Sequence, residues 1–290
     1  MSRRLEPGPE AGGGRGVTNV SAYTLACFGL IGTTVVDDGI LERAYAEAIA
    51  TQGVVTGTGA YARSMAQVHR ARGKTTIDVL RELFPGDEVR AQAAHLAFER
   101  SLSGALQRAR VRPVPGAPEA LAELAEAGYR ICLLSSVSRR QLEALLTALG
   151  WRDRFDLALG SDEVPRGCPF PDPVLQAMLQ LGVDDVRETV VVQSTESGVV
   201  SGRRAGAGVV AGVLTGSHPA ARLRKAGATH VLASVADLPA VLAGGGTGGL
   251  GVAEGGLDAA RMPGPRSASE AVSRAEGGQG AVRQSGTATS

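Results

Sequence analysis

Aromatic residues are scarce in this chain, since phenylalanine, tryptophan and tyrosine together make up 3% of its 290 residues. The core is therefore expected to consist mainly of leucine, valine and alanine. An excess of charge of one sign is also lacking, because the formal net charge is only +1. Nucleic-acid-binding surfaces are usually strongly basic, so we expect no nucleic-acid partner. No apolar run is long enough to cross a bilayer, so we expect no membrane partner.

Cysteine is scarce as well, and its spacing argues against a zinc site. The three cysteines are Cys27, Cys132 and Cys168, and none has CxxC or Cys/His spacing. Cys27 and Cys132 lie in apolar runs, where a free thiol behaves as a small hydrophobe. The first residues, MSRRLEPGPEAGGGRG, lack the apolar segment of a secretory signal. These features predict a reducing, cytoplasmic location, and the bias to arginine, alanine and glycine indicates a bacterial origin.

The ends of the chain differ in composition from its middle. Residues 1–20 are rich in glycine, proline and arginine, and residues 244–290 in glycine, alanine and serine. Neither segment has hydrophobic periodicity, so both are predicted to be disordered. In between, short apolar runs such as YRICLLSS and TVVVQS alternate with helical patterns such as SRRQLEALLTALG. This alternation predicts an α/β, Rossmann-like fold in which helices flank a parallel sheet.

One segment interrupts the alternation of strands and helices. Residues 39–110 contain only helical patterns, among them LERAYAEAIATQG and DEVRAQAAHLAFERSLSGAL. We therefore expect an α-helical cap over residues 39–110. It would be inserted between two parts of the α/β core, residues 21–38 and residues 111–243.

The order of first strand, helical cap and remaining sheet resembles the haloacid dehalogenase (HAD) superfamily, in particular its phosphonatase-like hydrolase branch. The resemblance is carried by GTTVVDDG, RPVPGAPEALAELAEAGYRICLLSSVSR and PFPDPVLQAMLQLGVDD. It implies an aspartate nucleophile, a second aspartate as general acid/base, a hydroxyl and a cation that hold the phosphoryl group, and further acids that bind magnesium. Mg²⁺ needs several hard oxygen ligands, and cations must offset the charge of the phosphoryl group.

The side chains that this chemistry requires are missing at the matching positions. The nucleophile position falls on Gly29, the acid/base position on Ile31, and the cation position before PFPD on Cys168. QSTESG stands where the family has glycine-aspartate-threonine and a further acid, so the metal positions fall on Ser194 and Gly198. The resemblance therefore implies a catalytically degenerate member, a pseudoenzyme. We expect no magnesium cofactor, because no carboxylate remains at the metal positions, Gly29 included.

Three polar residues remain for binding an anion. Thr33 in the glycine-threonine turn and Ser135 after the second strand keep hydroxyl groups, and Arg166 lies close to Cys168. Together with loop N–H groups and a helix N-terminus they could hold a small phosphorylated or phosphonate-like ligand. The alternative for Thr33 and Ser135 is that both close tight turns through hydrogen bonds to the backbone.

Several residues have both a functional and a structural interpretation. Cys168 is either a replacement nucleophile beside Arg166 or an inert loop thiol without a histidine base. Glu196 is either a substitute metal ligand or a first-turn acid that complements the helix dipole. The cap lysine that forms a Schiff base in phosphonatases falls on Thr76, with Lys74 nearby.

Four further residues are expected to be structural. His69 and His95 lie in helical patterns of the cap without ligand spacing, which is typical of surface or packing histidines. Asp37 and Asp38 lie where the chain leaves the first strand for the cap. We interpret these two acids as helix-capping and hinge residues.

Three functions are compatible with these observations. The first is a degenerate phosphonatase-like protein that binds a small anionic ligand or a protein partner. The second is a hydrolase or lyase of the same fold that uses non-standard residues among Cys168, Ser194, Glu196 and Lys74. The third is a structural interaction protein in which the cleft has no role. Whether the chain is an enzyme stays open at this point.

Overall fold

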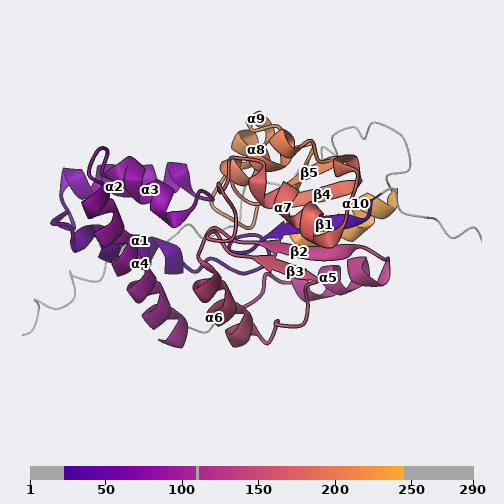
Figure 1. Cartoon of the computed structure of the whole chain (residues 1–290), viewed down its shortest axis with the longest axis horizontal. Helices are drawn as coiled ribbons and strands as arrows, with labels where there is room; N and C mark the ends of the chain where they lie inside the picture. Colours follow the sequence, from indigo (N-terminus) through magenta and orange to yellow (C-terminus); the bar gives the residue numbers. More distant parts are fainter. Residues whose placement is uncertain (1–22, 109–110, 245–290) are drawn as a thin grey trace, which may run out of the picture. The chain divides into compact units, whose positions relative to one another are not determined.

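The computed structural model describes residues 23–108 and 111–244. Within them, parallel strands form a six-stranded sheet in the order β3-β2-β1-β4-β5-β6 (Figure 1). This sheet confirms the α/β, Rossmann-like fold, whereas the predicted disorder of residues 1–20 and of the tail after Gly244 lies outside the described residues. The strands are β1 (Leu25–Gly29), β2 (Arg130–Leu134), β3 (Leu157–Leu159), β4 (Thr189–Gln193), β5 (Val209–Val213) and β6 (His230–Leu232).

Strand β1 shows why its sequence is apolar throughout. All five of its residues are buried. Ala26 and Phe28 belong to one apolar core, and Leu25 and Cys27 belong to a second core. Successive side chains of a strand point to opposite faces, so these two cores lie on the two sides of the sheet.

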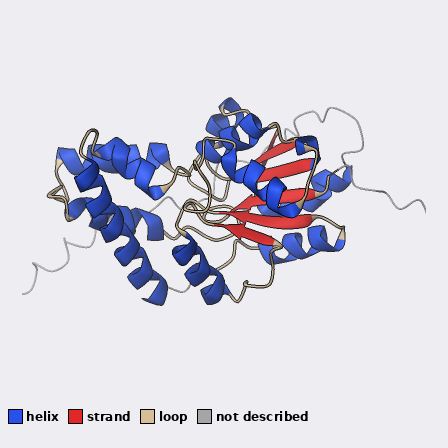
Figure 2. Cartoon of the chain, viewed as in Figure 1, coloured by secondary structure: helices blue, strands red, loops and turns tan. Residues whose placement is uncertain are grey.

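Helices cover both faces of the sheet (Figure 2). The second core includes Val174 of α7, Val199 of α8 and Leu223 of α9, whereas the first includes Leu121 of α5 and Leu142 of α6. In the described residues no helix combines the length and the apolarity needed to cross a bilayer. The helices of this part are α5 (Ala117–Glu126), α6 (Arg139–Leu149), α7 (Asp172–Leu181), α8 (Glu196–Ala205), α9 (Ala220–Lys225) and α10 (Leu238–Gly244), with 3₁₀ turns at Val186–Glu188 and Val235–Asp237.

The helices α1 to α4 follow β1 directly and lie in the segment predicted to be the cap, which we call the cap below. Tyr45 of α1 and Phe98 of α4 pack with their ring centroids 4.6 Å apart, and both rings are buried. Thr75 caps α3, since its hydroxyl oxygen accepts a hydrogen bond from the backbone N–H of Asp78. The cap helices are α1 (Ile40–Ala50), α2 (Gly59–Ala71), α3 (Thr76–Leu83) and α4 (Glu88–Arg108).

A tight turn connects β1 to the cap. Gly32 has a φ of 83°, a conformation that glycine adopts without strain. The Thr34 hydroxyl donates to the carbonyl oxygen of Gly29 at 3.1 Å, and Val36 N–H donates to the carbonyl oxygen of Arg112 at 3.0 Å. The two connections between core and cap therefore run side by side.

Candidate functional site

The carboxyl ends of β1, β2 and β4 meet at one cavity. In a parallel sheet the loops that follow the strands gather at this edge, where ligands usually bind. The cavity encloses about 50 Å³, which is room for roughly three to five water molecules. Its wall contains five of the positions singled out in the sequence, namely Gly29, Ile31, Ser135, Cys168 and Ser194.

The side chain of Gln193 fills the space beside two glycines of this site. Gln193 ends β4, lines the cavity and is 7% exposed. A Cβ atom added at Gly29 would lie 2.6 Å from Gln193 Oε1 and 2.8 Å from Thr33 Oγ1. A Cβ atom added at Gly198, in the first turn of α8, would lie 2.5 Å from the same oxygen of Gln193. A side chain at either of these positions, where the resemblance implies acids, would therefore require the Gln193 side chain to move.

The residues present do not fit a magnesium ion. At the third metal position, the Ser194 hydroxyl accepts a hydrogen bond of 3.1 Å from Thr33 Oγ1, and both residues are buried. No carboxylate from the described residues lines the cavity, and these residues contain no group of three or more histidine, cysteine or acidic side chains that could hold a metal. Mg²⁺ is usually held by carboxylates together with water or phosphate oxygens.

The predicted anion site of Thr33, Ser135 and Arg166 is not assembled. Ser135 Oγ accepts a hydrogen bond of 3.2 Å from Val137 N–H, which is the turn-closing alternative. Arg166 is absent from the cavity wall, because its guanidinium makes two 2.9 Å hydrogen bonds to Asp172. These bonds lower the pKa of the Asp172 carboxyl. Arg166 instead lines a wider neighbouring cavity that shares Thr75 and Cys168 with this one, and there its guanidinium is bound to Asp172 at the start of α7.

Cys168 lies in the cavity wall, but its surroundings do not activate it. The thiol pKa is raised by burial, although a hydrogen bond with Ser201 opposes this shift. The guanidinium of Arg166 packs over the Phe170 ring at 4.4 Å and bonds to Asp172 instead of the thiol. No histidine among the described residues lines the cavity to act as a base. The geometry favours the inert thiol over the replacement nucleophile.

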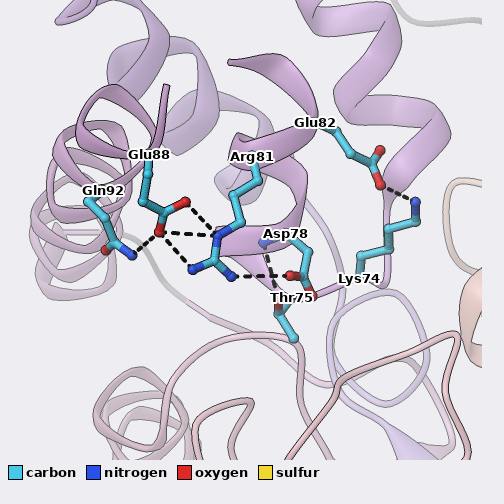
Figure 3. A network of polar contacts seen from close by, with 7 residues as sticks. All are labelled: Lys74, Thr75, Asp78, Arg81, Glu82, Glu88 and Gln92. Atoms are coloured by element: carbon cyan, nitrogen blue, oxygen red, sulfur yellow. Dashed lines mark hydrogen bonds and ion pairs between the residues drawn. The ribbon is translucent and has the colours of Figure 1, made fainter. Parts of the chain in front are cut away.

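Lys74 is held in a polar network of the cap, shown in Figure 3. Its ammonium pairs with Glu82, so it is not a free amine beside the cavity. In a separate set of contacts in the same view, Arg81 hydrogen-bonds Glu88 at 2.7 Å and, together with Gln92, lowers the pKa of Glu88 to about 2.

The remaining candidate residues lie outside the cavity wall. Thr76 is buried in the first turn of α3. Glu196 lies in the first turn of α8, where an acid complements the helix dipole, and it pairs with Arg222. His69 contacts Glu42 at 3.5 Å, and His95 is half-buried with no partner for its Nδ1 among the described residues.

The structure also shows an ion pair that the sequence analysis missed. Arg72, at the C-terminal end of α2, lines the cavity and pairs with Asp37; their side chains are 9% and 11% exposed. Asp37 was expected to be a hinge residue, and no sequence pattern linked it to Arg72. The sequence did contain a sign of the role of Gln193, because QSTESG has glutamine at a position where the family has glycine.

Comparison with known proteins assigns the family. The sequence profile of haloacid dehalogenase-like hydrolases matches residues 36–212, which is more than half of the chain. The phosphonoacetaldehyde hydrolase of Bordetella pertussis is 37% identical over 158 residues, or 46% of this chain and 56% of that protein. The enzyme of the same name from Pseudomonas fluorescens is 34% identical over 106 residues, or 36% of this chain and 38% of that protein. The chain thus spans about half or less of the length of these curated relatives.

Solved structures agree with this assignment at the level of the fold. A phosphonoacetaldehyde hydrolase-like protein from Oleispira antarctica has a TM-score of 0.67 and 20% identity, covering 83% of this chain and 96% of that one. A hydrolase from Pseudomonas syringae has a TM-score of 0.66 and 23% identity, covering 76% and 98%. The chain belongs to the haloacid dehalogenase-like hydrolase family.

Proposed function

We propose that this chain lacks magnesium-dependent phosphatase activity and binds a small polar ligand in the cavity without a metal. The position of Gln193 carries the proposal, because its side chain fills the space beside Gly29 and Gly198. A nucleophilic carboxylate at position 29 or a metal-binding acid at position 198 would require this side chain to move. Loss of one nucleophile from a catalytic unit commonly costs about four to six orders of magnitude in rate, and here the metal-binding acids are missing as well.

The small volume of the cavity and the polar side chains in its wall indicate a ligand that is small and polar. The name of the relatives, phosphonoacetaldehyde hydrolase, suggests a phosphorylated or phosphonate-like molecule. The cation predicted to hold such a group, Arg166, is bound to Asp172 outside the wall. The proposal therefore does not depend on a phosphate group.

The contacts of the candidate non-standard residues do not support catalysis by any of them. Burial raises the pKa of the Cys168 thiol, Lys74 pairs with Glu82, and Glu196 pairs with Arg222. Ser194 accepts a hydrogen bond from Thr33 and has no neighbouring base in the described wall. A purely structural interaction role stays a prediction.

The loss of catalysis is tested with the purified full-length chain. We expect no turnover of p-nitrophenyl phosphate or phosphonoacetaldehyde above the uncatalysed rate when Mg²⁺ is present. Steady turnover that EDTA abolishes would overturn this part of the proposal.

Metal-free binding is tested by thermal melting in the presence of EDTA. A ligand that binds the folded chain raises the melting temperature according to its concentration and affinity. We expect at least one of phosphate, acetate and acetamide to do so. Ser136→Leu, which fills the cavity wall, should remove the effect, whereas Ala148→Leu on the exposed side of α6 should keep it. If no probe stabilises the chain, the binding part is wrong.

A further inference from the structure

Gln193 is a largely buried polar residue in the cavity wall. Its carboxamide makes no hydrogen bond to any described residue, although 93% of the residue is removed from solvent. A buried polar group without a partner destabilises a protein unless a ligand or water satisfies it. A carboxamide offers both N–H donors and a carbonyl acceptor in one plane.

Most other polar side chains of the wall already have partners, although Ser136 makes no hydrogen bond to a described residue. Ser194 Oγ accepts from Thr33, and Ser135 Oγ accepts from Val137 N–H. Thr195 Oγ1 accepts from Gly198 N–H at 3.3 Å, and Thr75 Oγ1 donates to Asp78 at 2.6 Å. The Gln193 carboxamide is therefore the group with the most hydrogen-bonding capacity left for a ligand.

The described wall of the cavity contains no unpaired cationic side chain that could bind an anion. Arg72 is the one charged side chain in the described part of its wall, and Asp37 neutralises it. Asp37 does not line the cavity, and its Oδ1 is buried with no hydrogen-bond partner among the described residues. Burying a charge is costly unless it is paired. The N-terminus of α8 adds only a partial positive charge, and Glu196 already lies in its first turn.

We propose that the cavity binds an uncharged ligand with an amide-like pair of a donor and an acceptor, and that the Gln193 carboxamide recognises this pair. The inference rests on the proposed metal-free binding and adds the chemical class of the ligand. Two planar amides can exchange two N–H···O hydrogen bonds, which would satisfy both ends of Gln193. The cavity has room for roughly three to five water-sized groups, and acetamide has four non-hydrogen atoms.

The test compares acetamide with acetate and inorganic phosphate. Acetate has nearly the shape of acetamide but carries one negative charge, and phosphate carries more. Chemical-shift titration of the full-length chain with EDTA present gives a dissociation constant for each probe. We expect acetamide to bind more tightly than acetate and phosphate.

Two substitutions of Gln193 test its role directly. Gln193→Leu keeps a similar volume and removes the amide, so we expect acetamide to bind about tenfold more weakly, the factor typical of two lost hydrogen bonds. Gln193→Glu keeps the shape but replaces the donor by a carboxylate, and we expect a similar loss. Gln180→Leu makes the same change at an exposed position of α7 and should leave binding unchanged. Circular dichroism checks that each variant is folded. If Gln193→Leu is unfolded, the binding of acetamide to Gln193→Glu tests the role of Gln193.

The outcomes separate this inference from the proposed function. Tighter binding of phosphate or acetate than of acetamide, or unchanged acetamide binding in a folded Gln193 variant, overturns the inference and leaves metal-free binding intact. Turnover that EDTA abolishes overturns the proposed loss of catalysis. If none of the three probes binds, both the inference and the proposed binding are wrong.

Discussion

His218 Nε2 lies 3.1 Å from the backbone carbonyl oxygen of His69, so a side chain of the core contacts the end of cap helix α2. The other ring nitrogen, Nδ1, accepts a 2.7 Å hydrogen bond from Glu196 N–H. The ring is therefore neutral, with its proton on Nε2. The last carbonyl groups of a helix have no partner within it, and here the core supplies one.

Two more side chains complete this contact between cap and core. Ser197 Oγ donates to the carbonyl oxygen of Arg72 at 2.8 Å, and Arg222 donates to that of Arg70 at 3.2 Å. Because Arg72 also lines the cavity, the same contact positions part of the cavity wall.

Acid should weaken this contact through His218. Burial is the main reason that its pKa is lowered, so the folded chain holds the ring neutral, while the unfolded chain protonates it near pH 6.5. The stabilisation is then complete above about pH 6.5 and is lost as the pH falls through the lowered folded pKa. We expect the melting temperature of the wild type to fall more steeply between about pH 7 and pH 5 than that of His218→Gln.

The comparison of these two proteins isolates His218 from other titrating groups. Burial also lowers the pKa of His95, but His95 is present in both proteins and cancels in the difference. The charged groups that act on the His218 ring are Glu196, Arg222 and Arg72. Parallel pH curves for wild type and variant would show that His218 does not control the contact.

The buried pair of Arg72 and Asp37 should be sensitive to removal of one partner. Arg72→Met leaves the Asp37 carboxylate buried without its cation, which should lower the free energy of unfolding by about 3–5 kcal/mol. Urea unfolding measures this loss. A neighbouring pair gives the control: Arg112 and Asp38 lie 2.9 Å apart with side chains 64% and 53% exposed, so Arg112→Met should have little effect. Equal effects of the two substitutions would contradict the prediction.

The sheet and the meeting of strand ends could be predicted from the sequence for a simple reason. Runs such as LACFG in β1 are apolar throughout because both faces of the strand are buried. The alternation of strands and helices is compatible with few topologies. Parallel strands then bring the loops at Gly29, Ser135 and Ser194 to one edge. Strand burial and strand order depend on the apolar patterns of short segments, and these patterns are visible in the sequence.

The directions of individual side chains could not be predicted in the same way. Arg166 was placed near the site by its spacing, but its partner Asp172 decides where the guanidinium points. Arg72 meets Asp37 across 35 residues because the cap packs on the core. Gln193 fills space left by a glycine in β1 and another in α8, so its role depends on three segments at once.

Cys168 should react slowly with alkylating agents. Burial raises its thiol pKa, which leaves less thiolate at neutral pH, and thiolate is the reactive form. We expect iodoacetamide to modify it at least about tenfold more slowly than free cysteine at pH 7. Cys27 and Cys132 are fully buried, so Cys168→Ser should abolish modification of the folded chain. Modification faster than that of free cysteine would instead support a replacement nucleophile.

Restoring the acids of the family should fail unless Gln193 is also removed. A Cβ atom at position 29 would lie 2.6 Å from Gln193 Oε1, and one at position 198 would lie 2.5 Å from it. Gly29→Asp alone therefore forces the Gln193 and Thr33 side chains to move, and overpacking of this kind typically costs about 1–3 kcal/mol of stability. We expect the triple variant Gly29→Asp, Ser194→Asp, Gly198→Asp to be destabilised and to show no increase in melting temperature with Mg²⁺.

Adding Gln193→Gly to that triple variant should change the outcome. It restores the glycine that the family has at this position and frees the space beside residues 29 and 198. Three carboxylates would then stand at the edge of the sheet with room for a hydrated ion, so Mg²⁺ should raise the melting temperature. Gln193→Gly in the wild-type background is the control, because it frees the same space without adding a carboxylate and should not respond to Mg²⁺. If the triple variant binds Mg²⁺ equally well with Gln193 in place, then Gln193 is not what keeps the metal site from forming.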